Sequence, residues 1–506
     1  MALLSSVAQC VSSVLLYLFF LLLCAFILYC LYVKYIHMKF DHIPGPPRDS
    51  FLLGHSYTLN KKFEDYRVVH DQFLEWAEKY GPVYRVNFLH TVMLTVTSPE
   101  AVKELLMSPK YPKDPVAYKR LFYLFRKRFL GNGLLTDPDH DHWYKQRRVM
   151  DSAFSNSYLK GLMGTFNEKA ECLMEKLQEK AETQEHANMH HLVNRVTLDV
   201  ITTTAFGMEL NLLDDDTTPF PRAISLCLKG MVRYVRNPFM KFFPWNWKFI
   251  KEVEDSAVLL RRTGRECIEK RKQAVRAGED VPRDILTRIL ESAEEHGDYD
   301  DEQMLDNFVT FFVAGQETTA NQIAFTIMEL TRQPEITKRL RNEIDDVLGS
   351  KREIDYEDLG KLTYLTQVLK ESLRLYPPGP GTSRWIAEDS VIEGIFIPGG
   401  ASVTLNTYIM GRMEKFFKDP LKFDPDRFHP DAPKPYFCYF PFALGHRSCL
   451  GQVFSQMEAK VVMAKLLQRF EFQLVPGQPY GIMDTGTLRP HGGVVCRVTP
   501  YSRKGS

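Results

Sequence analysis

Apolar residues form one uninterrupted run near the start of the chain. The first 33 residues carry no charged side chain, and the run from Val14 to Val33 reads VLLYLFFLLLCAFILYCLYV. As a helix, a run of about 20 residues crosses the ~30 Å hydrocarbon core of a bilayer. The alternative is a cleaved signal peptide, which has a basic start, a shorter apolar core and a small-residue cleavage site. None of these is obvious here, so we predict a membrane anchor over residues 1–33.

The segment after the anchor is basic and rich in proline. Its basic residues are Lys34, Lys39 and Arg48. Positive residues favour the cytoplasmic side of a membrane, so we expect the long C-terminal part to face the cytosol. The sequence HIPGPPR, residues 42–48, contains three prolines, which prevent helix continuation and favour a stiff extended connection. We therefore predict a hinge over residues 34–50 that separates the anchor from one continuous body, residues 51–506.

Periodicity predicts a body that is mainly α-helical with small β-sheets. Residues rich in β-branched side chains, with turn signals between them, predict strands in two segments that begin at Pro82 and Ser390. A long helical pattern runs from Asp301 to Thr331, and an amphipathic helix follows Gly451. Both helices are important for function because the main chemical motifs lie in or beside them.

Composition excludes several classes of protein. The chain has 64 Lys and Arg against 63 Asp and Glu, a net charge of +1, which gives no overall electrostatic reason to expect nucleic acid. Its nine cysteines are scattered without a CxxC pair, which argues against a disulfide framework and a zinc ribbon. A reducing, cytosol-facing compartment fits these cysteines.

One cysteine lies in a constrained loop, FALGHRSCLGQ, residues 442–452. The pattern F-x-x-G-x-R-x-C-x-G comprises Phe442, Gly445, Arg447, Cys449 and Gly451. The start of the following helix lowers the pKa of a nearby thiol, which suits a nucleophile, a redox sensor or a metal ligand. The glycines allow a tight loop, the arginine pairs with an anionic group, and the phenylalanine excludes water. Together these features favour a large, flat, anionic metal cofactor over a buried structural cysteine.

This loop resembles the heme-binding loop of the cytochrome P450 family of heme-thiolate monooxygenases. The resemblance implies the P450 fold, a heme b cofactor, and Cys449 as the axial ligand of the heme iron. A thiolate ligand pushes electron density toward iron and favours O–O cleavage.

A second motif, FFVAGQETTANQIAF, lies inside the long helix from Asp301. It matches the family pattern A-G-x-[DE]-T-[TS] at Ala314, Gly315, Glu317, Thr318 and Thr319. Small residues let a flat macrocycle approach the helix, and the resemblance implies that Glu317 and Thr318 deliver protons to bound oxygen. The alternative is a polar break on a core helix whose threonine bonds its own backbone.

The third motif, KESLRLYPP, places Glu371 and Arg374 on one face of a helix. The family resemblance makes Arg427 the third member of a structural triad that holds the heme loop. ExxR recurs by chance, and Glu329 and Arg332 show the same spacing. Context, including the prolines after the helix, selects the first pair.

The last family motif is W-x-x-x-R, at Trp143 and Arg147. The resemblance implies that both side chains bond a heme propionate, and that Arg384 supplies another propionate contact. Ordinary packing of an aromatic residue beside a surface arginine is the alternative. His186 and His190 have a zinc-like i, i+4 spacing but lack the HExxH glutamate, so we interpret them as a polar segment.

These motifs predict a membrane-bound, O₂-dependent monooxygenase without its own electron source, since the chain has no GxGxxG or GxxxxGK motif. The resemblance implies an NADPH-dependent flavoprotein reductase as partner and a single-pass location in the endoplasmic reticulum membrane. A heme-thiolate isomerase or dehydratase and a non-catalytic heme sensor are the alternatives.

Several long segments of the body further resemble sterol side-chain hydroxylases of this family, which implies a lipophilic sterol substrate. The chain departs from them at Gln316, beside the acid, and at Gly379 and Pro380, where they have a large aromatic.

Overall fold

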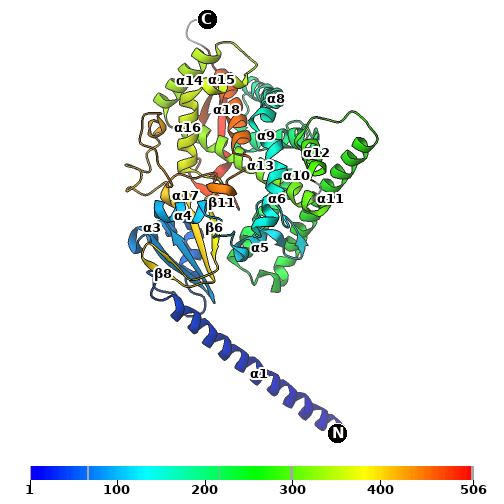
Figure 1. Cartoon of the computed structure of the whole chain (residues 1–506), viewed down its shortest axis with the longest axis vertical. Helices are drawn as coiled ribbons and strands as arrows, with labels where there is room; N and C mark the ends of the chain where they lie inside the picture. Colours follow the sequence, from blue (N-terminus) through cyan, green and yellow to red (C-terminus); the bar gives the residue numbers. More distant parts are fainter. Residues whose placement is uncertain (1, 65–67, 216, 297–299, 503–506) are drawn as a thin grey trace.

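Helices form most of the body, and the four-stranded sheet lies toward the end from which the N-terminal helix leaves it (Figure 1). The computed structural model describes residues 2–64, 68–215, 217–296 and 300–502. This architecture confirms the predicted mainly helical fold with small sheets.

The helices follow one another along most of the chain. Their bounds are α1 Ala2–Phe40, α2 Ser56–Glu64, α3 Val69–Tyr80, α4 Pro99–Met107, α5 Pro115–Phe122, α6 His140–Asp151, α7 Asn156–Lys160, α8 Met163–Glu182, α9 Met189–Phe206, α10 Phe220–Arg236, α11 Trp247–Arg276, α12 Ile285–His296, α13 Asp301–Leu330, α14 Pro334–Leu348, α15 Tyr356–Lys361, α16 Thr363–Leu375, α17 Thr407–Met410 and α18 Gln452–Arg469.

The largest sheet has the strand order β1-β2-β9-β6. Strands β1 and β2 form the hairpin predicted after Pro82, β2 pairs parallel with β9, and β6 pairs antiparallel with β9. The strand bounds are β1 Val83–Phe88, β2 Thr91–Val96, β3 Tyr123–Leu124, β4 Lys127–Arg128, β5 Ala187–Asn188, β6 Gly381–Ile386, β7 Ser390–Ile392, β8 Ile395–Ile397, β9 Ala401–Asn406, β10 Phe470–Leu474, β11 Ile482–Asp484, β12 Leu488–Pro490 and β13 Val495–Pro500.

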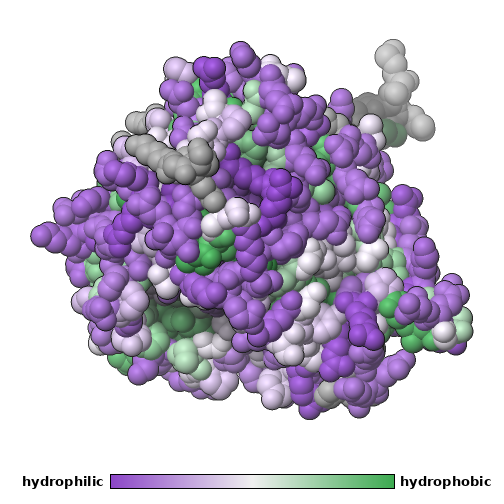
Figure 2. Space-filling model, turned by 90° about the horizontal axis from the view of Figure 1, so that it is seen from above, coloured by the Kyte–Doolittle hydropathy of each residue, from purple (hydrophilic) through white to green (hydrophobic). Residues whose placement is uncertain are grey.

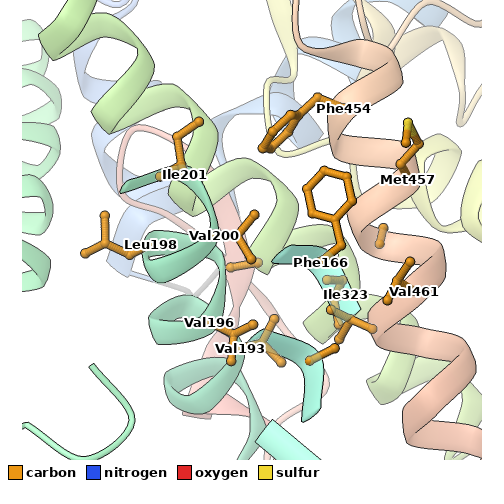
Figure 3. Close-up of a cluster of buried hydrophobic side chains, with 14 of the residues drawn as sticks. Phe166, Val193, Val196, Leu198, Val200, Ile201, Ile323, Phe454, Met457 and Val461 are labelled. Atoms are coloured by element: carbon orange, nitrogen blue, oxygen red, sulfur yellow. The ribbon is translucent and has the colours of Figure 1, made fainter. Parts of the chain in front are cut away.

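Helix α13 is the central element of the helical core. It begins at the predicted Asp301 and ends one residue before the predicted end, and nearly all of its length is buried, polar residues included. Side chains from α8, α9, α13 and α18 interdigitate beside it, among them Phe166, Ile201, Ile323 and Phe454 (Figure 3). The rings of Phe166 and Phe454 meet edge to face with centroids 5.1 Å apart. This packing holds the long helix motif and the helix after the cysteine loop in one rigid unit.

The N-terminal helix is longer than the predicted anchor. The span Gln9–Phe40 is apolar enough to cross a membrane, since it contains an 18-residue window with a mean hydropathy of 2.9, and the helix projects away from the body (Figure 1). It continues through residues 34–40, which were expected to belong to the hinge, because the first proline comes only at Pro44. Its last turns are not separated from the body: Val33 and Phe40 are buried, and Lys39 donates to the Gly399 carbonyl at 2.9 Å.

The end of the body opposite this helix carries mostly hydrophilic side chains (Figure 2). An apolar helix at one end and a polar surface at the other suit a protein that stands on a membrane.

Candidate active site

The cysteine loop leads directly into α18, as the sequence predicts. The Cys449 backbone N–H donates to the Phe442 carbonyl at 2.8 Å, which closes the loop. Gly445 has φ +71°, and a Cβ there would lie 2.3 Å from the carbonyl oxygen of Leu106. This glycine is therefore required both by backbone conformation and by the close approach of the last turn of α4.

The thiol of Cys449 retains accessible surface although protein surrounds it. Burial raises its pKa, and this effect outweighs the Gly451 N–H bond and the positive charges of Arg147 and Lys113, which lower the pKa. The expected lowering by the helix start is thus wrong for the protein alone, because removal of water from the thiolate is the larger effect.

Two arginines tie the loop to α6. Arg447 stacks on the Trp143 ring at 4.0 Å and donates to the Asp137 carbonyl at 2.8 Å. Arg147 donates to the Ser448 carbonyl at 2.8 Å. The W-x-x-x-R pair is therefore brought to the residues next to Cys449 from about 300 residues away in the chain.

Arg384 on β6 is buried with only part of its hydrogen bonds made. Its Nη1 donates to Thr382 Oγ1 at 3.1 Å, while its Nε and Nη2 have no partner among the described residues. Burial, with the nearby charges of Arg384 and Arg447, lowers the pKa of Lys113 to about 8, although Tyr118 acts in the opposite direction. The buried cations Lys113, Arg384 and Arg447 thus lie near one another, and two nitrogens of the Arg384 guanidinium donate to no acceptor among the described residues. Such a set is costly unless an anion joins it.

The long helix presents one open position among buried ones. Ala314 is exposed, whereas Val313, Gln316 and Glu317 are buried. The Thr318 hydroxyl donates to the Ala314 carbonyl at 2.8 Å, the backbone bond that the alternative interpretation expected. Because that hydroxyl keeps its lone pairs, it is still able to accept a hydrogen bond from water.

Gly315 was expected, with Ala314, to let a flat macrocycle approach α13, but its Cβ position faces α9. A Cβ there would lie 2.8 Å from the side chain of Ile201 on α9. It is therefore small because α9 packs against α13, and only Ala314 remains as the small residue on the open face. Gln316 also turns toward α9, where it donates to the Asn194 side chain, so its difference from sterol hydroxylases lies in helix packing.

Glu317 is almost completely buried, with 4% of its surface exposed. Its carboxylate accepts a hydrogen bond from the Thr487 hydroxyl at 2.6 Å. Burial raises its pKa, while this hydrogen bond and the charges of Arg489 and Lys229 lower it. A carboxyl whose pKa is raised toward neutrality is suited to donate and recover a proton.

The ExxR pair that context selected is fully buried. Arg374 Nε and Nη2 donate to the two carboxylate oxygens of Glu371 at 2.7 and 2.8 Å, and Arg427 Nε lies 3.4 Å from the same carboxylate. Arg374 also bonds the backbone carbonyls of Gly411 and Pro420. Glu329 and Arg332 form a pair too, but Arg332 is 44% exposed. The three residues of the proposed triad are thus together at a junction of α16 and the loops after α17.

The two histidines do not form a metal site. His186 precedes α9 and is exposed, while His190 lies inside α9, so they do not share the helical face that the spacing required. Within the described residues, no group of three His, Cys, Asp or Glu side chains is placed to hold a metal ion.

Residues 44–499 match the cytochrome P450 family. The chain belongs to this family. It is 29% identical over 480 residues to cytochrome P450 4d2 of Drosophila melanogaster, an alignment that covers 90% of this chain and 94% of that protein. It is 29% identical over 475 residues to human cytochrome P450 4V2, covering 89% and 88%, and 27% identical over 494 residues to mouse cytochrome P450 3A41, covering 91% and 92%. The protein is thus a heme-thiolate monooxygenase, and its heme cofactor is that of the P450 family.

The donors of this P450 fit a heme with two carboxylates. Nε and Nη2 of Arg384, which have no partner among the described residues, are free to donate hydrogen bonds to a carboxylate. The positive charges of Arg447 and Lys113 lie beside them. Cys449 offers a thiol on the same loop as Arg447. These are the two things a heme needs from a protein, a soft axial donor and neutralisation of its propionates.

Sequence reasoning missed Lys113 and Thr487. Lys113 stands in an ordinary loop, KYPKDP, and Thr487 in a short turn, so neither belongs to a motif of helical or strand period. Their place at the site is visible in the three-dimensional structure and not in the sequence pattern.

Proposed function

We propose that this P450 hydroxylates the flexible side chain of a sterol, in the manner of cholesterol 24-hydroxylase. The balanced reaction takes R–H, O₂, NADPH and H⁺ to R–OH, H₂O and NADP⁺. Bound heme supplies the iron at which O₂ is reduced and one oxygen atom is transferred. The observation that carries the proposal is the Cys449 thiol, accessible in its loop beside the buried cations Lys113, Arg384 and Arg447, with Nε and Nη2 of Arg384 unpaired among the described residues.

Cys449 is proposed as the axial ligand, with Phe442, Gly445, Arg447 and Gly451 shaping its loop. The Gly451 N–H bond to the sulfur supports this role, because such a bond stabilises the thiolate form.

Propionate binding is proposed for Arg384, Arg447 and the pair Trp143 and Arg147, with Lys113 added. The support is electrostatic, since a buried guanidinium with free N–H groups binds a carboxylate more strongly than a neutral acceptor. Ala314 is proposed to let the ring lie close to α13. Glu371, Arg374 and Arg427 are proposed to hold the loops under the heme.

Glu317 and Thr318 are proposed to move protons. Burial raises the pKa of the Glu317 carboxyl, so it takes up a proton more readily than an exposed glutamate, and Thr318 accepts a hydrogen bond from a water while its own hydrogen bonds the Ala314 carbonyl. This pair argues for oxygen chemistry rather than isomerisation, which needs no proton delivery.

The sterol substrate rests on the resemblance of long segments from HIPGPPR to LVPGQ to cholesterol 24-hydroxylase. A sterol binds through burial of apolar surface at ~25 cal/mol per Å² without charged contacts. A Cβ added at Gly379 would meet nothing within 4 Å, so there is open space at the position where the resembling enzymes have an aromatic. We therefore expect the tail to be oxidised at more than one carbon.

The anchor and the electron source complete the proposal. Helix α1 would hold the protein in the endoplasmic reticulum membrane with the hydrophilic end toward the cytosol (Figures 1 and 2). An NADPH-dependent flavoprotein reductase would supply electrons from the cytosolic side.

Reconstitution of the full chain with reductase, NADPH and cholesterol tests the substrate by mass spectrometry of the products. Hydroxylation on the side chain supports the proposal. Ring hydroxylation alone, or no turnover of any sterol, contradicts the substrate and leaves the monooxygenase assignment intact. Cys449→Ser tests the ligand, because it should remove the red-shifted Soret band of the reduced carbon-monoxide complex while Cys438→Ser, a buried cysteine outside the motif, keeps it.

A further inference from the structure

A continuous chain of hydrogen bonds reaches the carboxylate of Glu317 from the surface of the helical core. His190 Nε2 lies 2.8 Å from Asn321 Oδ1, Asn321 Nδ2 donates to Thr487 Oγ1 at 3.0 Å, and the Thr487 hydroxyl donates to Glu317 Oε2 at 2.6 Å. The four residues come from α9, α13 and the turn between β11 and β12. None of these bonds is local in sequence, since each joins residues that are at least 131 positions apart.

The three hydrogen bonds all run in the same donor-to-acceptor direction, from His190 toward Glu317. Burial lowers the pKa of His190 to about 4, so its ring is neutral near pH 7, and Nε2 carries the proton because it faces an amide oxygen. Each donor then points to the next acceptor: ring N–H to amide oxygen, amide N–H to hydroxyl oxygen, hydroxyl to carboxylate. Hydrogen bonds aligned in this way polarise one another, and they strengthen most the final bond, to the charged group.

The turn that carries Thr487 is held on two further sides. Asp484 pairs with Arg236 at the end of α10 at 3.1 Å, and the Leu488 N–H donates to the Pro378 carbonyl at 2.9 Å. Gly486 in the same turn has φ +105°, and a Cβ there would lie 2.9 Å from Met231 on α10. The Thr487 hydroxyl is thus held in place by neighbouring elements and is not free to follow a moving glutamate.

The amide in this chain cannot pass a proton on, because Asn321 has no titratable group. These hydrogen bonds therefore orient the Glu317 carboxyl but do not supply it with protons. We propose that Thr487, supported by Asn321 and His190, is a positioning residue that holds the Glu317 carboxylate in one rotamer and sets the pH range over which it acts. This inference rests on the proposed proton-transfer role of Glu317.

The expected change in the pKa of Glu317 follows from the direction in which the Thr487 hydrogen bond shifts it. A hydroxyl that donates to a carboxylate favours the charged form and lowers the pKa of Glu317. Lys229 on α10 and Arg489 on β12 act in the same direction, and burial opposes all three. Loss of the hydroxyl therefore raises this pKa, and proton delivery by the protonated acid persists to higher pH.

The experiment uses the full chain reconstituted with reductase, and measures the fraction of NADPH electrons recovered as hydrogen peroxide across pH, which requires no knowledge of the substrate. Thr487→Val keeps the shape of the side chain and removes the hydroxyl. We expect its pH profile to move up by about one unit, about tenfold in the acid equilibrium, since a hydrogen bond to a charged group has this magnitude. A glutamate released from its rotamer should also raise the peroxide fraction at every pH.

Two matched variants isolate the hydroxyl. Thr487→Ser restores it and should return the profile to that of the parent. Thr485→Val makes the same change two residues away, where the hydroxyl donates to the Thr487 carbonyl at 3.5 Å and not to Glu317, and should leave the profile unchanged. If Thr487→Val does not fold, Asn321→Leu removes the donor to Thr487 and should shift the profile in the same direction by a smaller amount.

The outcomes separate this inference from the proposed function. Glu317→Gln should abolish the pH-dependent step, and if it does so while Thr487→Val leaves the profile in place, the positioning role is wrong and the role of Glu317 stands. A profile in Thr487→Ser that matches Thr487→Val also overturns the inference, since the hydroxyl is then not responsible. An unchanged profile in Glu317→Gln removes the acid role and this inference with it.

Discussion

Substitution of Glu371 by glutamine should destabilise the junction of α16 and the loops after α17, where Arg374 and Arg427 meet its carboxylate. Burial raises the pKa of Glu371 despite its two bonds from Arg374, so the ion pair is not a source of net stability by itself. Its removal is still costly, because Arg374 is fully buried and Arg427 lies beside it, and both would lose their carboxylate. Breaking a buried pair in this way costs about 3–5 kcal/mol.

The measurement is the temperature at which the full chain loses its heme spectrum. An unfolding entropy of ~2.1 cal/mol/K per residue gives about 1 kcal/mol per degree for a body of roughly 450 residues, so we expect a decrease of about 3–5 °C. Glu329→Gln is the matched control, because it breaks a pair of the same spacing whose arginine is 44% exposed. It should cost about 1 kcal/mol or less, since water replaces the carboxylate and glutamine still accepts from Tyr376. Equal midpoints for the two variants, or an unchanged Glu371→Gln, would refute the reasoning.

Four further outcomes follow from the same contacts. Arg384→Leu should lower heme content in purified protein, measured as the ratio of heme to protein absorbance, more than Arg339→Leu, which removes an exposed arginine paired with Asp426; equal heme content would show that Arg384 has no anionic partner. Thr318→Ala should keep the heme spectrum but divert NADPH to peroxide several-fold, and Thr326→Ala, which removes the same backbone bond elsewhere on α13, should not. Deletion of residues 2–28 should leave a folded heme protein with residual vesicle binding through exposed Phe242, Trp245 and Trp247, whereas deletion of residues 2–40 should lower heme content, because it also removes the buried Val33 and Phe40; equal heme content would show that these contacts are dispensable. Pro380→Trp should narrow the mixture of sterol products seen by mass spectrometry, because it fills the open space beside Gly379.

The amino-acid sequence alone determined the features that depend on local pattern. The apolar run predicts α1, the long period-3.6 pattern predicts α13 with its first residue at Asp301, and β-branched runs with turns predict β1, β2 and β9. These succeed because hydrophobic period and turn residues act over short stretches of chain. The cysteine loop succeeds for the same reason, since five of its residues lie within ten positions.

Only the tertiary structure decided what each side chain meets. Gly315 packs on Ile201 of α9, and the end of α1 docks on the body, because distant elements approach these points closely. The thiol of Cys449 has a raised pKa because burial, a property of the whole fold, outweighs its local helix start. Lys113 joins Arg384 and Arg447, and Thr487 reaches Glu317 across 170 residues of chain. Electrostatics and hydrogen bonding act through space, and a sequence records order along the chain but not which distant groups share one buried volume.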